Sequence, residues 1–163
     1  AVFSGSCSRA TRDQVEIYKG KAPTFQIDAA TAMEHGHDVS EIADWVLAQT
    51  QAPLVYSSAD PDIVSAAQEA FGATAAAEAI EDVFSRLAST LREKGLRRLV
   101  VAGGETSGAV ITGLKAETLT IGPRAAAGVP LVQASGMALA LKSGNFGGPD
   151  FFAHALAIME QEQ

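Results

Sequence analysis

Three short segments combine glycines with hydroxyl, amide or charged side chains, a mixture suited to binding anions. They are Ser4–Ser8, Gly103–Gly108 and Lys142–Asp150. Each one follows a short apolar run that is typical of a buried strand. Because ligands of open parallel sheets bind outside the carboxyl ends of the strands, the three segments are candidates for one shared site.

The second segment has the composition of an anion cradle. Gly103 and Gly104 let the backbone turn tightly and approach a ligand, and the helix expected after them offers free N–H groups and a positive dipole end. Thr106, Ser107 and Gly108 complete the segment, with two hydroxyl donors.

Glu105 is the unusual member of this segment, because a carboxylate repels phosphate. A water-bridged Mg²⁺ would resolve the repulsion. The alternative is that Glu105 and Thr106 only favour the start of the helix. The residues alone leave both interpretations open.

In the first segment Ser4, Ser6 and Ser8 surround Cys7. Their hydroxyl groups can bind an anion or simply cap the next helix. Cys7 is disfavoured as a nucleophile, since no histidine pattern supplies a base.

The third segment offers glycine amides and one amide side chain. Its candidate binding residues are Lys142, Gly144, Asn145, Gly147 and Gly148. In the functional interpretation, backbone amides meet phosphates or a base while Asn145 donates and accepts hydrogen bonds. The alternative is a flexible turn in which glycines take positive φ and Lys142 lies in solvent.

Standard fingerprints are absent. The sequence has no G-x-x-x-x-G-K-[ST] and no G-x-G-x-x-G, and the serine of the GETSG run comes one position too late for a G-x-S-x-G nucleophile elbow. The EHGHD run at 34–38 holds four potential metal ligands, but no further fixed ligand is visible. It is predicted to be a solvated loop, and no metal site is assigned.

The elements that must position these segments alternate between short apolar runs and helical periodicities. Strands are expected at 1–5, 23–28, 53–59, 97–103, 117–121, 129–133 and 137–142. Helices are expected at 8–19, 39–50, 61–94 with a break near Gly72, 105–114, and from Pro149 and Asp150 onward. This alternation predicts a single α/β domain with helices on both faces of a mostly parallel sheet. The closely spaced strands of the last third can pair partly antiparallel.

Composition narrows the class of partner. The 163 residues are 47% hydrophobic and carry a net charge of −7 without a basic block, which argues against nucleic acid. The longest apolar stretch is interrupted by Pro130, Gln133 and Ser135, which argues against a membrane span. The single cysteine and the lack of a secretion leader favour a cytoplasmic location.

The motifs SGSCSRATRDQ, VVAGGETSGAV and LKSGNFGGPDFF, in this order, resemble those of a known enzyme family. The family is that of the four-carbon acid sugar kinases, which include the 3-oxo-tetronate kinases, and the similar part is their C-terminal nucleotide-binding domain. The run IGPRAAAGVPLV also matches the family's pattern. The resemblance covers the chain from its first residues to its end.

The resemblance implies a two-domain, ATP-dependent kinase in which ATP and Mg²⁺ are bound and a sugar acid is phosphorylated. ATP contacts carry over to Ser6, to Gly104–Ser107, and to Gly147 or a neighbouring glycine. Thr11 and Gln14 match later positions of the first motif, to which no role is assigned.

The resemblance also implies that other functional parts lie outside this sequence. The chain opens inside a strand without a methionine, so it is expected to be a domain of a longer protein that holds the sugar acid and the catalytic base elsewhere. This chain alone is then expected to bind ATP or ADP and to transfer nothing. Whether it forms a homo-oligomer is left open.

Two other functions are alternatives to this kinase domain. The runner-up is a non-catalytic module that binds a phosphosugar through the same loops. A hydrolase-like enzyme is disfavoured, because an elbow and a credible base are absent.

Overall fold

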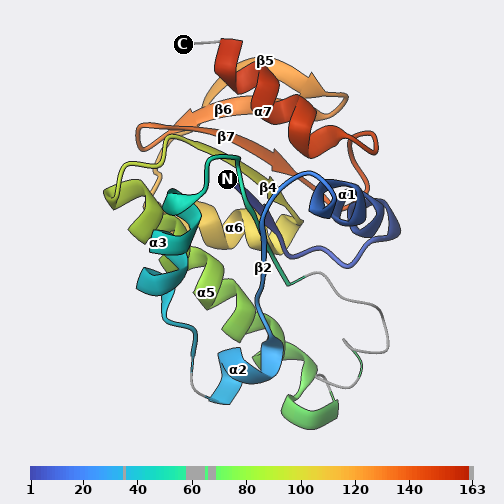
Figure 1. Cartoon of the computed structure of the whole chain (residues 1–163), viewed down its shortest axis with the longest axis vertical. Coiled ribbons are helices and arrows are strands. Elements are labelled where there is room, and N and C mark those ends of the chain that lie inside the picture. Colours follow the sequence, from blue (N-terminus) through green and yellow to red (C-terminus); the bar gives the residue numbers. More distant parts are fainter. Residues whose placement is uncertain (35, 58–64, 66–68, 162–163) are drawn as a thin grey trace.

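A computed structural model of the chain describes residues 1–34, 36–57, 65 and 69–161. Its centre is a seven-stranded mixed sheet with the order β2-β3-β1-β4-β7-β6-β5 (Figure 1). The first five strands of this order run parallel, and β6 and β5 pair antiparallel at one edge. The predicted α/β class and the largely parallel sheet are confirmed.

The strands and helices have the following bounds. The strands are β1 (Val2–Ser4), β2 (Thr24–Gln26), β3 (Leu54–Tyr56), β4 (Arg98–Ala102), β5 (Thr120–Ala126), β6 (Val129–Ala134) and β7 (Met137–Lys142). The helices are α1 (Arg9–Lys19), α2 (Ala29–Glu34), α3 (Val39–Ala48), α5 (Ala73–Glu93), α6 (Gly104–Gly113) and α7 (Phe151–Gln161).

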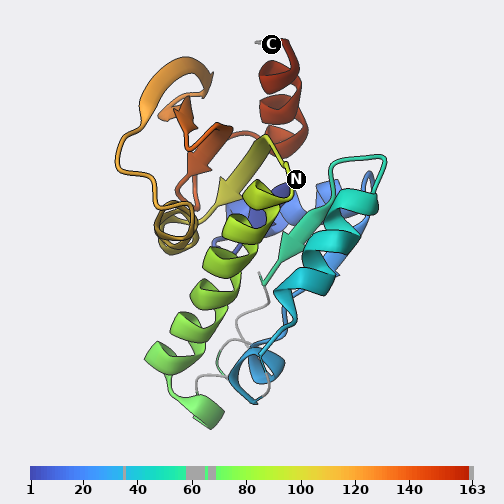
Figure 2. The same ribbon diagram turned by 90° about the vertical axis from the view of Figure 1, so that its left-hand side faces the viewer.

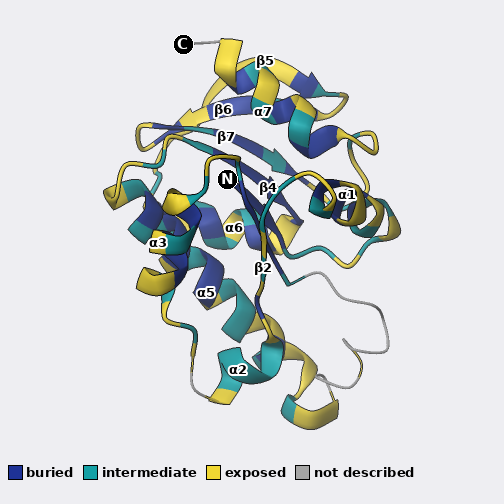
Figure 3. Cartoon of the chain, in the orientation of Figure 1, coloured by how far each residue is buried: buried dark blue, intermediate teal, exposed yellow. Residues whose placement is uncertain are grey.

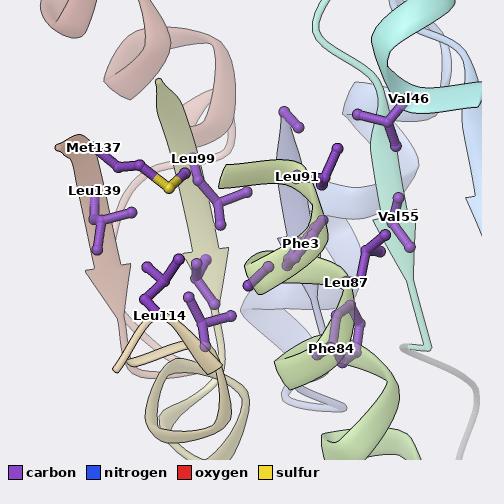
Figure 4. Packing of buried hydrophobic residues seen from close by; sticks show 14 of the residues in the cluster. Phe3, Val46, Val55, Phe84, Leu87, Leu91, Leu99, Leu114, Met137 and Leu139 are labelled. Atoms are coloured by element: carbon purple, nitrogen blue, oxygen red, sulfur yellow. The ribbon is translucent and has the colours of Figure 1, made fainter. Parts of the chain in front are cut away.

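Both faces of the sheet are covered, so the central strands are apolar on both sides. On one face α3, α5 and α6 enclose a core that includes Phe3, Phe84 and Leu139 (Figure 4). On the other face α1 and α7 pack over a second core that includes Val100 and Phe152. Successive residues of a strand point to opposite faces, which explains why neighbours in β4 belong to different cores.

The long helix α5 continues past the sheet and leaves its first turns beside α2 (Figures 1 and 2). Its buried positions follow the predicted apolar stripe and include Val83, Leu87 and Leu91. Gly72 precedes the helix with φ 84°, in agreement with the predicted break. Most of the predicted helical stretch before Gly72 lies outside the described residues.

Two elements differ from the sequence predictions. Helix α2 was not expected, because it has no buried residue and therefore no apolar stripe. The strand predicted at 117–121 instead runs from Thr120 to Ala126. It is an edge strand, mostly exposed (Figure 3) and irregular in its pairing, so its side chains show no clean alternation.

Among the described residues, the helices are too short or too polar to cross a lipid bilayer.

Candidate functional site

The ends of three adjacent parallel strands bring the three predicted segments together. Strand β1 lies between β3 and β4, and β4 pairs with β7. The amide of Gly5 donates to the Ala102 carbonyl at 3.0 Å, and the amide of Gly103 donates to the Lys142 carbonyl at 2.8 Å. The loops after β1, β4 and β7 therefore begin side by side at one edge of the sheet.

Ser6 lies between the second and third loops. A β-carbon placed on Gly103 would lie 3.2 Å from the Ser6 amide nitrogen, and one on Gly144 would lie 2.5 Å from Ser6 Oγ. Gly103 also has φ 124°, in the region that favours glycine. Gly103 and Gly144 thus allow the loops to meet at Ser6. Ser4, by contrast, is completely buried beneath the first loop at the end of β1.

Helix α6 begins at this meeting point with its amides free. Gly103 is its N-cap and provides no side-chain cap. Within the described chain, no acceptor pairs with the amides of Gly104, Glu105 or Thr106, whereas the Ser107 amide donates to the Gly103 carbonyl at 2.9 Å. The first turn of α6 therefore presents three donors and the positive end of its dipole.

The residues at the start of α6 differ in how far they are exposed to solvent. Gly104, Glu105 and Gly108 are exposed, while Thr106 is buried. The Ser107 hydroxyl oxygen is buried without a hydrogen-bond partner among the described residues. Among the described residues, the three free amides and the Ser107 hydroxyl are therefore hydrogen-bonding groups of this turn that no protein partner uses.

Lys142 is not in solvent, contrary to the solvated-turn alternative. Its side chain is 1% exposed, and its Nζ donates to Thr11 Oγ1 at 2.9 Å and to the Gly144 carbonyl at 3.0 Å. Burial lowers the pKa of Lys142 to about 8. The reason for the difference is that α1 covers the end of β7 with polar side chains, which satisfy the ammonium group.

Two residues that the sequence left without a role hold the third loop. Thr11 donates to the Gly144 carbonyl at 2.7 Å, and Gln14 Nε2 donates to three carbonyls, the nearest being that of Gly148 at 2.9 Å. Both side chains are buried. Polar residues at three-residue spacing near the start of a helix are the only sequence signal of this contact.

A cavity of about 790 Å³ opens beside the first two loops. Its polar side includes Ser6, Gly104 and Glu105, and much of the remainder is formed by alanines of α5 together with Ile27 and Ile80. A volume of this size with an apolar lining and a few polar groups is typical of small-molecule sites.

Glu81 of α5 and Glu105 of α6 both line this cavity. The pKa of Glu81 is raised, chiefly by desolvation and further by the negative charge of Glu105 and then of Glu78. The two carboxylates therefore form a local excess of negative charge next to the free amides of α6.

Among the described residues, no group of three or more His, Cys, Asp or Glu side chains gathers as a metal cluster. His35 of the EHGHD run lies outside the described residues. Asp38 caps α3 by accepting from the amides of Ser40 and Glu41, as its predicted place at the start of a helix suggests.

The fold and this edge define an α/β domain with convergent glycine loops and a helix N-terminus, an arrangement that can bind anionic ligands. Residues 1–152 match the family described as "Nucleotide-binding C-terminal domain". The chain belongs to this family, as the motif resemblance predicted.

Curated relatives share its sequence closely. The chain is 47% identical to a 3-oxo-tetronate kinase of Brucella melitensis over 99% of its own length, and 43% identical to one of Haemophilus influenzae over 94%. It spans 38% of the length of each relative. A crystal structure of a Haemophilus influenzae protein of the DUF1537 family superposes with a TM-score of 0.91 at 41% identity, covering 97% of this chain and 40% of that one.

Proposed function

We propose that this chain is the ATP-binding part of a kinase that phosphorylates a four-carbon acid sugar such as a 3-oxo-tetronate. The observation that carries the proposal is the convergence of the free α6 amides with the loops at Ser6 and Gly144, in a chain of a nucleotide-binding family. The names of the relatives support the reaction and its substrate class.

In this proposal the phosphates of ATP lie on the amides of Gly104, Glu105 and Thr106. Phosphoryl transfer needs positioning and neutralisation of charge more than covalent chemistry, and fixed amides with a helix dipole supply both. The neighbouring loops close the site around the phosphates, and the apolar wall of the cavity offers a surface for the nucleoside.

The residues present also fit Mg²⁺. This ion is usually held by one or two carboxylates together with phosphate oxygens and water, and Glu81 and Glu105 line the same cavity. When bound, Mg²⁺ would neutralise phosphate charge. The carboxylate of Glu105 would then hold the ion or its water, which gives a reason for an acidic residue at an anion site.

The sugar acid and the catalytic base are proposed to lie in the part of the relatives that this chain does not span. This domain would then bind ATP and position the γ-phosphate of the nucleotide toward a sugar acid bound by that other part of the protein. We propose a cytoplasmic location for such a metabolic enzyme.

Thermal unfolding tests this proposal, with ATP, ADP and a sugar phosphate each added with Mg²⁺ and with EDTA. A ligand at 100 times its Kd stabilises the fold by about 2.7 kcal/mol, a readily measured shift. We expect ATP and ADP to raise the melting temperature, and more so with Mg²⁺. Stabilisation by the sugar phosphate alone would contradict the kinase proposal and favour a phosphosugar-binding module.

A further inference from the structure

Polar side chains on one face of α1 form hydrogen bonds to the third loop. Ser8, Thr11 and Gln14 follow one another at intervals of three residues, so they lie along the same side of the helix. Ser8 Oγ lies 2.8 Å and Thr11 Oγ1 lies 2.7 Å from the Gly144 carbonyl oxygen, more than 130 positions away in the sequence. These contacts tie a helix of the first motif to the loop of the third.

The side chain of Gln14 contacts further carbonyls along the same loop. Gln14 Nε2 lies 3.2 Å from the carbonyl oxygen of Phe146, 3.1 Å from that of Gly147 and 2.9 Å from that of Gly148. With Gly144, four carbonyls within five residues therefore point toward α1. Because one side-chain amide group contacts three carbonyls, Gln14 fixes the orientation of all three.

The direction of these carbonyls sets the direction of the amides. In a planar trans peptide the N–H points opposite to the C=O of the same unit. The N–H groups of Asn145, Gly147 and Gly148 share peptide units with three of the captured carbonyls, so they point away from α1. Within the described part of the chain these three amides donate to no acceptor.

Lys142 adds a positive charge directly beneath this loop. Its ammonium group is buried against Thr11 and Gly144, and no carboxylate among the described residues forms an ion pair with it. A buried cation without a counter-ion is costly. An anion bound on the outer side of the loop would compensate part of this cost.

We propose that Thr11, Gln14 and Lys142 are positioning residues for the polyphosphate of the nucleotide. They hold the loop carbonyls inward, so that the amides of Asn145, Gly147 and Gly148 are already aimed outward at the phosphates. Lys142 acts from beneath as a buried charge and does not touch the ligand. This inference rests on the proposed function, because it assigns the anion of that same site.

The matched pair Thr11→Val and Thr11→Ser tests the inference. Valine keeps the shape of threonine but neither donates to Gly144 nor accepts from Lys142, whereas serine retains the hydroxyl. Isothermal titration with Mg-ATP and with pyrophosphate gives the affinities, and thermal unfolding reports the fold. We expect Thr11→Val to weaken both ligands about tenfold, equal to 1.4 kcal/mol, and Thr11→Ser to stay within about twofold of the original chain.

A second variant, Gln14→Met, tests the same inference if Thr11→Val does not fold. Gln14→Met has a similar length but cannot donate to Phe146, Gly147 or Gly148. It should weaken Mg-ATP and pyrophosphate about tenfold. Equal affinities in all folded variants, or a loss in Thr11→Ser as large as in Thr11→Val, would overturn the inference.

The outcomes for the unmodified chain separate the two proposals. If it binds pyrophosphate but not ATP, the proposed function fails, while the positioning inference is still judged by the pyrophosphate affinities of the variants. If it binds ATP and the variants bind equally well, only the inference fails. If it binds neither ligand, both are wrong.

Discussion

Gly5 lies directly against Thr106, so closely that a β-carbon at position 5 would stand 2.1 Å from the Thr106 hydroxyl oxygen. The first residue comes from the loop after β1 and the second from the first turn of α6. Thr106 is buried on a helix and has little room to move aside. The absence of a side chain at Gly5 therefore allows the first loop to reach the free amides of α6.

The change Gly5→Ala is expected to destabilise the fold by about 1–3 kcal/mol, the usual cost of overpacking. Thr106→Ala removes the clashing oxygen, so the double variant should lose less than the sum of the two single variants. Urea denaturation of all four proteins measures this coupling. Strictly additive losses would show that the contact does not constrain the loop.

At the first turn of α6, the proposed phosphate site, Gly104→Asp should separate ligand binding from stability. A β-carbon at Gly104 meets no atom within 4 Å, and an acidic residue in the first turn of a helix is favourable by about 0.3–1 kcal/mol. The variant should therefore unfold no more easily than the original chain yet lose the thermal response to Mg-ATP. Gly104→Ala is the matched control and should keep most of that response. A full response in Gly104→Asp would rule out phosphate binding at this turn.

The interaction of Glu81 with Glu105 makes a prediction that needs no ligand. The charge of Glu105 contributes to the raised pKa of Glu81, after desolvation. Glu105→Gln should therefore lower the pKa of Glu81 toward its usual value, and Glu78→Gln should lower it less. An NMR titration of the glutamate carboxyl carbons measures both shifts. An unchanged pKa in Glu105→Gln would mean that the two carboxylates do not face the same space.

The close crossing of α5 and α6 depends on Gly113. A β-carbon there would lie 2.0 Å from the backbone carbonyl oxygen of Ser85, whereas one on Gly108 of the same helix meets nothing within 4 Å. Gly113→Ala should lower the free energy of unfolding by about 1–3 kcal/mol, and Gly108→Ala should raise it by about 0.5–1 kcal/mol. Chemical denaturation compares the two, and a stabilised Gly113→Ala would show that the helices can separate freely.

The sheet and the three loops were predictable because each loop follows a continuous apolar strand and contains its own glycines. Val100 and Val101, for example, are buried on opposite faces, so the whole strand had to be apolar. Such local patterns survive in a single sequence. They place Ser6 and Gly104 just after strands, and this placement does not depend on which segments pack beside them.

The contacts between loops were not predictable, because they join residues far apart in the sequence. Gln14 contacts Gly148 across 134 positions, and the spacing of polar residues on α1 does not say which distant segment they contact. Lys142 was open to the opposite interpretation, since lysine is almost never fully buried. The burial of Lys142 depends on Thr11, which only the folded chain brings within reach.

Lys142 should make the stability of the fold depend on alkaline pH. Its pKa is lowered to about 8 in the folded protein and returns to about 10.4 in the unfolded chain. Between these values the unfolded chain holds a proton that the folded chain has lost, so the free energy of unfolding rises with pH. Below about pH 8 both states are protonated and this contribution is constant.

The pH window is limited by Tyr18, whose pKa is raised by burial to about 12. The folded chain keeps that proton longer, so Tyr18 contributes stability that is lost above about pH 10. Urea denaturation between pH 8.5 and 9.5, above the range in which the buried Ala1 amino group contributes most, should therefore show a rise of up to about 1 kcal/mol per pH unit, and Lys142→Met should remove most of it. The same slope in both proteins would mean that Lys142 keeps its proton in this pH range. The hydrogen bonds from the Lys142 ammonium group to Thr11 and Gly144 would then stabilise its charge enough to offset the effect of burial.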